Sequence, residues 1–336
     1  MQNYGIDGAA VQNFVERLGF ANTAARDSLT VVAAAKAAEH FGRVWYAEYD
    51  FSSSGVSATE LSNRVITNWK KLVDAGYTAK ASYLHDSGLP VVQLYGIAVG
   101  QNLMKPADWT KLINWFKKDS PTKYRATVIG AATWEWLFGN MTKPKTGWES
   151  PIEALDMVTS WSVGCCGSKG QTDGAQWWRD NIDVVQAKWL KTHGQRYMST
   201  INPGSSGQNI GLANLGANPF RRNCGATYWE QAVDSVAAGA DTIFVAMFDE
   251  VDESTAMYKV TSKTGLYPKS SNIFGLDVDG CDLKSDYYLR LGAATNGLFT
   301  GRTPLSYKLP IELAPGESLN GFDFTQGLTD SLIPNP

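Results

Sequence analysis

Short apolar runs alternate with amphipathic stretches along most of the chain. Continuous apolar runs of about four to eight residues are typical of buried strands, whereas repeats at i, i+3 and i+4 are typical of helices. The pattern predicts strands at residues 5–14, 43–51, 89–99, 126–134, 157–163, 197–202 and 241–248. It predicts helices at residues 24–40, 57–76, 107–118, 177–193 and 226–238. Ser57 followed by Glu60 forms a capping box at the start of the second helix, and Gly76 marks its end.

This alternation of strands and helices indicates a parallel sheet wrapped by helices. The number of strands favours a (β/α)8 TIM-type barrel over an open sheet, and no GxGxxG sequence follows any strand, which argues against a nucleotide-binding fold. The pattern contains seven strands where such a barrel has eight, and the first begins close to Met1. We therefore expect residues 1–300 to form a catalytic barrel that lacks its first strand. Residues 301–336 are expected to form a turn-rich extension that packs on it, and the turn-rich character already begins after Leu291.

Composition narrows the function without deciding it. Hydrophobic residues make up 43% of the chain and charged residues 19%, which is ordinary for a globular protein with a large core. The net charge is -3 and no basic block occurs, so we expect no nucleic-acid partner. No apolar run approaches the ~20 residues of a membrane helix, so we expect no membrane partner either. The 12 tryptophans fit either a large core or a sugar-binding site, because apolar sugar faces lie flat on indole rings. The oligomeric state stays open.

The cysteines and the first residues bear on location. Cys165, Cys166, Cys224 and Cys281 allow two disulfides in an oxidising compartment, although their spacing does not fix the pairing. Asn140-Met141-Thr142 is a single glycosylation sequon. The first residues have neither the basic start nor the apolar stretch of a secretory signal. We expect a secreted protein even though this chain shows no signal peptide.

Polar and aromatic residues gather where the predicted strands end. In (β/α) barrels the active site lies at the carboxyl ends of the strands. These residues are therefore our candidates for substrate binding: Asp7, Gln12, Glu48, Tyr49, Asp50, Tyr95, Trp134, Trp136, Trp161 and Asn202.

An acidic cluster follows the last predicted strand, and it is the strongest candidate for catalysis. Asp249, Glu250, Asp252 and Glu253 lie in one run, and mutual repulsion raises the pKa of at least one of them. Hydrolysis of a glycosidic bond needs one protonated carboxylic acid and a second carboxylate that acts as base or nucleophile. The alternative is a solvated acidic turn, which is the usual place for a run of charges. The position directly after an apolar strand favours a catalytic site.

Other chemistries fit less well. His40, His85 and His193 fall on predicted helices that precede strands, which argues against a Ser/His/Asp triad or a histidine metal site. Asp277-Val278-Asp279-Gly280 lacks the ligand spacing of a calcium loop and predicts a turn. A Cys165 or Cys166 nucleophile would have no histidine nearby in the sequence.

Several segments together match a known group of enzymes. The most specific segment joins Ala238-Gly239-Ala240 to the run from Val245 to Ala256, which contains the acidic cluster. Weaker matches include Tyr4-Gly5-Ile6-Asp7-Gly8, Tyr49-Asp50, Leu89-Pro90-Val91-Val92, Trp161-Ser162-Val163-Gly164, Asn202-Pro203-Gly204 and Asp286-Tyr287-Tyr288. On these segments, from about Tyr4 to Leu291, the chain resembles the glycoside hydrolase family 99-like group, which is related to the family 71 α-1,3-glucanases.

The resemblance implies a (β/α)8 barrel that acts on α-linked glycans without a metal or organic cofactor. In family 99 the catalytic pair is a Glu-x-x-Glu segment, which matches Glu250 and Glu253. Glu253 would be the general acid/base, and Glu250 would assist the sugar 2-hydroxyl through a 1,2-anhydro sugar intermediate. Family 71 instead has Asp and Glu at this spacing followed by Ser, and Glu253-Ser254 resembles that version, so both mechanisms stay open. Asp249 and Asp252 would then support the turn or contact the substrate.

Two functions remain in view at this point. The first is a polysaccharide-degrading hydrolase that acts on an α-glucan or an α-mannan. The second is a non-catalytic or degenerate carbohydrate-binding member of the same group. The intact Glu250/Glu253 pair favours the enzyme, because a degenerate member need not keep it. A structural wall protein is a third reading, and it predicts no tryptophan-lined cleft.

Overall fold

The computed structural model describes the chain except residues 53–54, 100–102, 140–141, 165–171, 212–219, 326–327, 330, 332 and 334–336. Cys165, Cys166 and the sequon asparagine Asn140 lie outside the described residues. The chain forms two compact units. Unit 1 comprises Met1–Trp161 and Trp189–Arg196, and unit 2 comprises Ser162–Lys188 and Tyr197–Pro336.

Seven parallel strands follow one another along the chain, as the sequence predicts. They are β1 (Gly8–Phe14), β2 (Val44–Asp50), β4 (Leu89–Ile97), β5 (Thr127–Thr133), β6 (Met157–Trp161), β7 (Arg196–Ile201) and β8 (Thr242–Val245). A two-residue strand that the pattern missed, β3 (His85–Asp86), pairs antiparallel with β4. The described residues therefore contain one parallel strand fewer than a (β/α)8 barrel.

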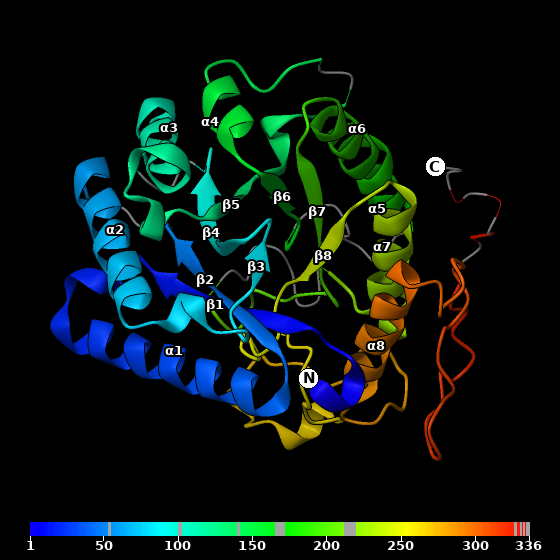
Figure 1. The fold of residues 1–336 in the computed structure, drawn as a ribbon. Helices are drawn as coiled ribbons and strands as arrows, with labels where there is room; N and C mark the ends of the chain where they lie inside the picture. Colours follow the sequence, from blue (N-terminus) through cyan, green and yellow to red (C-terminus); the bar gives the residue numbers. More distant parts are fainter. Residues whose placement is uncertain are drawn as a thin grey trace. The chain divides into compact units, whose positions relative to one another are not determined.

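Helices follow the strands. They are α1 (Ala21–Phe41), α2 (Ala58–Asp74), α3 (Pro106–Asn114), α4 (Glu149–Ala154), α5 (Thr172–Trp178), α6 (Val184–Thr192), α7 (Ala226–Ala237) and α8 (Tyr287–Phe299) (Figure 1). One half of the capping box predicted for α2 is present, because the Ser57 side chain accepts from the Glu60 N–H at 3.2 Å, while the Glu60 carboxylate accepts from Arg64. Gly76 lies just past the end of α2 with φ +78°, a conformation that favours glycine.

Three elements differ from the sequence pattern. The predicted helix at 177–193 starts earlier and is interrupted by a π-helical turn at Arg179–Asp183. Helix α8 was missed, and the tail after Leu291 stays helical up to Phe299, because α8 buries residues all round and shows no amphipathic period. Helix α4 was missed because it is short.

In unit 1 the period of two along β2 divides its side chains between two environments. Trp45, Ala47 and Tyr49 face the helical layer, where the Tyr49 hydroxyl donates to the Asn68 side chain on α2 at 2.7 Å. Tyr46, Glu48 and Asp50 face the opposite side of the sheet and are also buried. Both faces of β2 are thus covered, as in other parallel sheets.

The core of unit 2 lies around α7 and α8, which lie side by side (Figure 1). The segment after α8 packs on this core. The Tyr307 hydroxyl donates to Asp234 Oδ1 on α7 at 2.6 Å, and the Trp229 indole donates to the Ser306 carbonyl at 2.8 Å. A disulfide between Cys224 and Cys281 joins the start of α7 to the segment before α8. It closes a separation of 57 residues, which stabilises the folded state by roughly 4 kcal/mol in the chain-entropy description.

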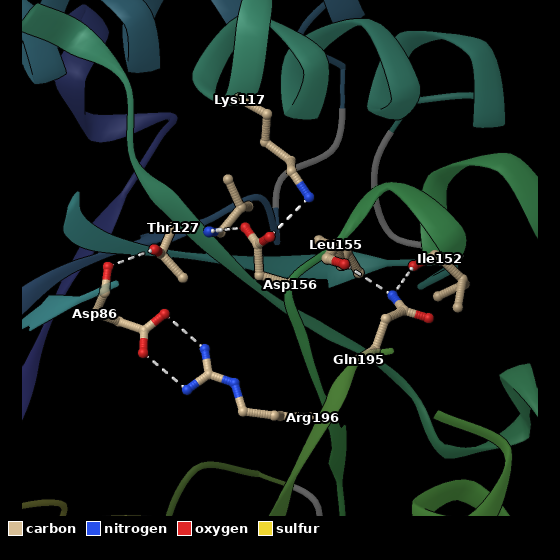
Figure 2. Close-up of polar contacts among 9 residues, drawn as sticks. Asp86, Lys117, Thr127, Ile152, Leu155, Asp156, Gln195 and Arg196 are labelled. Atoms are coloured by element: carbon tan, nitrogen blue, oxygen red, sulfur yellow. Dashed lines mark hydrogen bonds and ion pairs between the residues drawn. The ribbon is translucent and has the colours of Figure 1, made fainter. Parts of the chain in front are cut away.

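A polar network lies where β5, β6 and β7 begin, all within unit 1 (Figure 2). Asp156 accepts from the Lys117 ammonium at 2.7 Å and from the Val128 N–H at 2.8 Å. Arg196 donates two hydrogen bonds to the Asp86 carboxylate, at 2.8 and 2.7 Å. Polar residues at the amino ends of barrel strands serve stability rather than catalysis. We therefore infer that this network stabilises the fold of unit 1.

We predict that Asp156→Ala lowers the free energy of unfolding by about 1–3 kcal/mol, because it leaves the Val128 N–H without an acceptor. Chemical denaturation measures the change. Glu39→Ala is the matched control, since Glu39 pairs with Lys80 on the exposed surface and its loss costs about 0.5 kcal/mol or less. Equal effects of the two variants on the free energy of unfolding would contradict a stabilising role for Asp156.

Candidate active site

The acidic cluster follows β8 in unit 2, and its four carboxylates fall into two classes. Glu250 and Glu253 are half-buried, whereas Asp249 and Asp252 are exposed. The interpretation of the acidic cluster as a solvated turn therefore fits the two aspartates but not the two glutamates. Strand β8 is also shorter and more exposed than the apolar run at 241–248 suggested, and all four of its residues are only half-buried.

Hydrogen bonds fix the backbone around the two glutamates. The Thr255 hydroxyl contacts both the carboxylate Oε2 (3.0 Å) and the backbone carbonyl (3.1 Å) of Glu250. The Ser206 N–H donates to the Glu253 carbonyl at 2.7 Å. Ser254, directly after Glu253, has φ +57°, a left-handed conformation that is rare for a residue with a Cβ. The loop thus holds both glutamates in a defined and locally strained backbone.

Burial and neighbouring carboxylates raise the pKa of both glutamates. Burial first, and then the charge of Glu253, raises the pKa of Glu250 to about 7. Burial and then the charge of Asp252 raise the pKa of Glu253. Glu250 therefore holds its proton at a pH where an isolated glutamate is ionised. A pair in which one carboxyl is protonated and the other ionised is what acid/base hydrolysis requires.

Unit 1 carries a second polar cluster, on the face of the sheet opposite the helices. Gln12, Glu48 and Gln93 lie in register on β1, β2 and β4. The Tyr46 hydroxyl donates to Gln93 Oε1 at 2.8 Å, and Gln93 Nε2 donates to Glu48 Oε1 at 3.2 Å. The side chain of Gln12 donates to Asp50 Oδ2 at 2.6 Å.

The surroundings of Glu48 favour the protonated form of its carboxyl. Burial, and then the charge of Asp50, raises the pKa of Glu48 to about 8, although the hydrogen bond from Gln93 opposes the shift. A neutral carboxylic acid can donate a hydrogen bond as well as accept one. Together with the carboxyl and amide groups beside it, Glu48 suits recognition of hydroxyl groups.

Aromatic side chains lie on the same face of the sheet, nearer the strand ends. Tyr95 on β4 and Trp161 at the end of β6 are half-buried and meet edge to face, with ring centroids 5.1 Å apart. Trp134, just after β5, is also half-buried and lies edge-on to Phe138 at 5.4 Å. Partly exposed rings of this kind can receive the apolar face of a sugar.

Three predicted substrate-binding residues lie elsewhere. Tyr49 is fully buried against α2, because it is one residue out of phase with Glu48 and Asp50. Trp136 is fully buried in the core, where its indole donates to the Ser160 hydroxyl at 3.1 Å and its ring packs on Trp189. Asp7 precedes β1, so it lies at the amino end of its strand and not at the carboxyl end.

Asn202, at the end of β7 in unit 2, serves the turn in which it lies. Its side-chain oxygen accepts from the Gly204 N–H at 3.1 Å, and its amide nitrogen donates to Gln231 at 3.4 Å. The side chain is buried, with 7% of its surface exposed. Asn202 therefore holds the turn, and its predicted substrate-binding role stays a prediction.

The remaining predictions concern histidines and metals. His85 lies on β3 and not on a helix as predicted, because the chain forms a hairpin before β4. The segment from Asp277 to Gly280 is a turn, as predicted. Among the described residues, no group of three or more His, Cys, Asp or Glu side chains is arranged to hold a metal ion. None of the described helices is long and apolar enough to cross a membrane.

Sequence reasoning missed several residues that shape these clusters. Tyr46 precedes Glu48 by two positions on the same face of β2, so strand periodicity could have found it. Thr255 contacts Glu250 from within the same loop, and Arg222 reaches the loop from a distant segment. Neither of these two has a local sequence signal.

Solved structures share this fold. The GH99 endo-alpha-mannosidase from Bacteroides thetaiotaomicron matches with a TM-score of 0.62 at 21% identity, over 88% of this chain and 76% of that chain. The same enzyme in complex with BIS-TRIS-Propane matches with a TM-score of 0.60 at 20% identity, over 81% of this chain and 74% of that chain. The chain has the fold of the GH99 endo-alpha-mannosidases.

A structure described as a glycoside hydrolase-like protein also matches the GH99-like fold of this chain. Its TM-score is 0.54 at 13% identity, over 87% of this chain and 82% of that chain. No protein-family model and no curated protein matches the sequence. The comparisons therefore support the predicted barrel type through the fold alone.

We predict that Glu253→Gln lowers the pKa of Glu250, because the charge of Glu253 is the second largest cause of its elevation. The pKa stays above the ordinary glutamate value, since burial is the largest cause and persists. Carbon-13 NMR titration of the Glu250 carboxyl measures the change. Asp249→Asn is the control and should produce a smaller fall, because Asp249 is the weakest of the contributing charges. An unchanged Glu250 pKa in Glu253→Gln would show that the two carboxyls do not interact.

Glu48 makes stability depend on pH. Its pKa in the folded protein lies above the ordinary value of 4.5, so folding binds its proton more tightly and stability falls as the pH rises from about 5 to 8. The loss is on the order of 4 kcal/mol, at about 1.4 kcal/mol per pH unit. We predict that Glu48→Gln, which cannot ionise, flattens this part of the profile in urea denaturation. A profile as steep as that of wild type would contradict the account, and exposed Glu39→Gln should leave the wild-type profile unchanged.

Proposed function

We propose that this protein is a glycoside hydrolase that cleaves α-linked glycans of the α-mannan or α-glucan type. Glu253 is the general acid/base, and Glu250 is its partner carboxylate. The observation that carries the proposal is the half-buried Glu250/Glu253 pair after β8, in which both pKa values are raised while the neighbouring aspartates are exposed.

The chemistry follows from what the two carboxyls can do. The proton of Glu253 goes to the glycosidic oxygen as the bond from that oxygen to C1 breaks. The Glu250 carboxylate accepts the proton of the sugar 2-hydroxyl, so that the 2-oxygen can bond to C1 and form a 1,2-anhydro sugar. Water then opens this ring at C1, Glu253 takes the proton of the water, and Glu250 returns its proton to the 2-oxygen. Each carboxyl ends in the state in which it began.

Two routes for the Glu250/Glu253 pair predict different product stereochemistry. The two-step route through the 2-hydroxyl retains the configuration at C1, because C1 is displaced twice. A single attack by water that a carboxylate activates inverts it. The Glu250/Glu253 identity favours the family 99 route, whereas Ser254 after Glu253 keeps the family 71 version as the alternative.

Two observations bear on which glycan is the substrate. Two of the solved structures that share this fold are of a GH99 endo-alpha-mannosidase, which favours α-mannose linkages. In unit 1, Tyr95 and Trp161 offer ring faces or edges, and Glu48, Asp50 and Gln12 offer polar groups that suit sugar hydroxyls. We propose that these residues bind carbohydrate.

We also propose a secreted location. The Cys224–Cys281 disulfide supports it, since such bonds persist mainly in oxidising compartments. Degradation of an external polysaccharide fits the same location.

Glu253→Gln and Glu250→Gln test the function. We predict that each lowers turnover on a panel of α-mannans and α-glucans by about 10²–10⁴-fold, because a general acid or base contributes about that much. Binding of the glycan, measured by calorimetry, persists in Glu253→Gln. The matched control is Glu39→Gln, an exposed carboxyl-to-amide change on α1, which keeps wild-type turnover.

Two outcomes would contradict the proposal. Undiminished hydrolysis in Glu253→Gln would remove its role as the acid. Glycan binding by wild type without any hydrolysis across the panel would instead favour a non-catalytic carbohydrate-binding protein.

A further inference from the structure

Arg222 is a buried arginine in the segment that precedes α7 in unit 2, and only 5% of its surface is exposed. Its Nη2 donates to the Ser254 carbonyl at 2.5 Å and lies 3.4 Å from the Ala256 carbonyl. The guanidinium also lies 4.7 Å from the centre of the Tyr288 ring. These contacts join Arg222 to the backbone directly after Glu253.

The segment that carries Arg222 is firmly anchored. Next to it, the Asn223 N–H donates to Asp279 Oδ2 at 2.7 Å, and Cys224 forms the disulfide with Cys281. Gly204 lies so close that an added Cβ would come within 2.9 Å of Arg222 Cγ and 2.7 Å of the Phe220 carbonyl. Because its own backbone is anchored in this way, Arg222 can hold another segment in place.

The segment that Arg222 contacts needs such support. Ser254 has φ +57°, and a serine stays in this conformation only where its surroundings impose it. The carbonyl of Ser254 accepts the short hydrogen bond from Arg222. The Ser206 N–H holds the Glu253 carbonyl on the preceding peptide. Glu253 is therefore fixed by one hydrogen bond at its own carbonyl and by Arg222 at the next.

The buried position of Arg222 lowers the stability of the folded protein. Nε and Nη1 of Arg222 are buried without a hydrogen-bond partner among the described residues. A buried guanidinium with unused donors lowers stability. Proteins tolerate such unfavourable local arrangements mainly where a residue serves function. Its neighbour Arg221 is exposed and carries no such cost.

We propose that Arg222 is a positioning residue for Glu253, holding the left-handed Ser254 peptide so that the Glu253 carboxyl stays in its half-buried place. This inference rests on the proposed hydrolase function of the Glu250/Glu253 pair. Arg222 acts on the loop through the backbone, since it donates to the Ser254 and Ala256 carbonyls and packs on the Tyr288 side chain.

The first test compares Arg222→Met, Arg222→Lys and the matched control Arg221→Met. We expect kcat to fall about 10–100-fold in Arg222→Met with KM changed less than threefold, because small misplacement of a catalytic group is costly. Arg222→Lys, which keeps one charged donor, should recover most of this loss. Arg221→Met should match wild type. A kcat in Arg222→Met within twofold of wild type would overturn the proposal.

The second test asks whether the left-handed peptide is the link. Ser254→Gly, placed in the Arg222→Met background, should raise kcat several-fold, because glycine adopts positive φ without support. Ser254→Ala also removes the hydroxyl but keeps Cβ, so it should give no recovery. Equal effects of the two substitutions would overturn the link through Ser254.

The pH profile separates positioning from general destabilisation. Burial is the main cause that raises the pKa of Glu253, so a loosened loop lets water in and lowers this pKa. We expect the high-pH limb of kcat to move to lower pH in Arg222→Met and to return in Arg222→Lys. A variant that is only less stable melts at lower temperature and keeps the wild-type limb, and that result would contradict the proposal.

Hydrogen exchange gives a readout that does not depend on hydrolysis. Amides of residues 250–256 should exchange at least tenfold faster in Arg222→Met than in Arg221→Met. Unchanged exchange would overturn the positioning role. If exchange rises as expected but wild type hydrolyses no glycan, the proposed function fails while the structural role of Arg222 stands.

Discussion

Partial burial of two neighbouring carboxyl groups is the constraint that shapes the candidate site. Taking a carboxylate out of water is unfavourable, so the loop after β8 must either neutralise Glu250 and Glu253 or hold them rigidly. The protein does both. Burial raises the pKa of both carboxyls, that of Glu250 to about 7, and Thr255, Ser206 and Arg222 fix the backbone that carries the pair. The strained peptide at Ser254 is a consequence of that fixation.

The same physics acts independently in unit 1. Glu48 is buried on the sheet face opposite α2, and burial and then the charge of Asp50 disfavour its charged form. The Tyr46–Gln93–Glu48 chain of hydrogen bonds satisfies the groups that burial would otherwise leave unpaired. The network at the start of β5, β6 and β7 is of a different kind, since its ion pairs are partly exposed and lie at the amino ends of the strands (Figure 2).

Much of this arrangement could be predicted from the sequence, because strand and helix periods are local properties. All seven parallel strands and the Ser57 cap of α2 followed from the pattern. Side-chain direction was harder, since a shift of one residue sends Tyr49 towards α2 while Glu48 faces the other way. From the sequence, Trp136 could equally well have been a residue that stacks on a sugar. Its packing on Trp189 in the structure shows that it belongs to the core. Arg222 depends on contact between segments far apart in the chain, which one sequence does not reveal.

The most direct test of the central claim is proton NMR of the first sugar released by the wild-type protein from α-mannan and α-glucan oligosaccharides. The account predicts release of a reducing sugar, and the route through the 2-hydroxyl predicts that this sugar first appears with the α configuration of the bond that was cleaved. Initial appearance of the β anomer would replace that route with direct attack by water. Absence of any released sugar across both substrate classes would contradict the hydrolase itself.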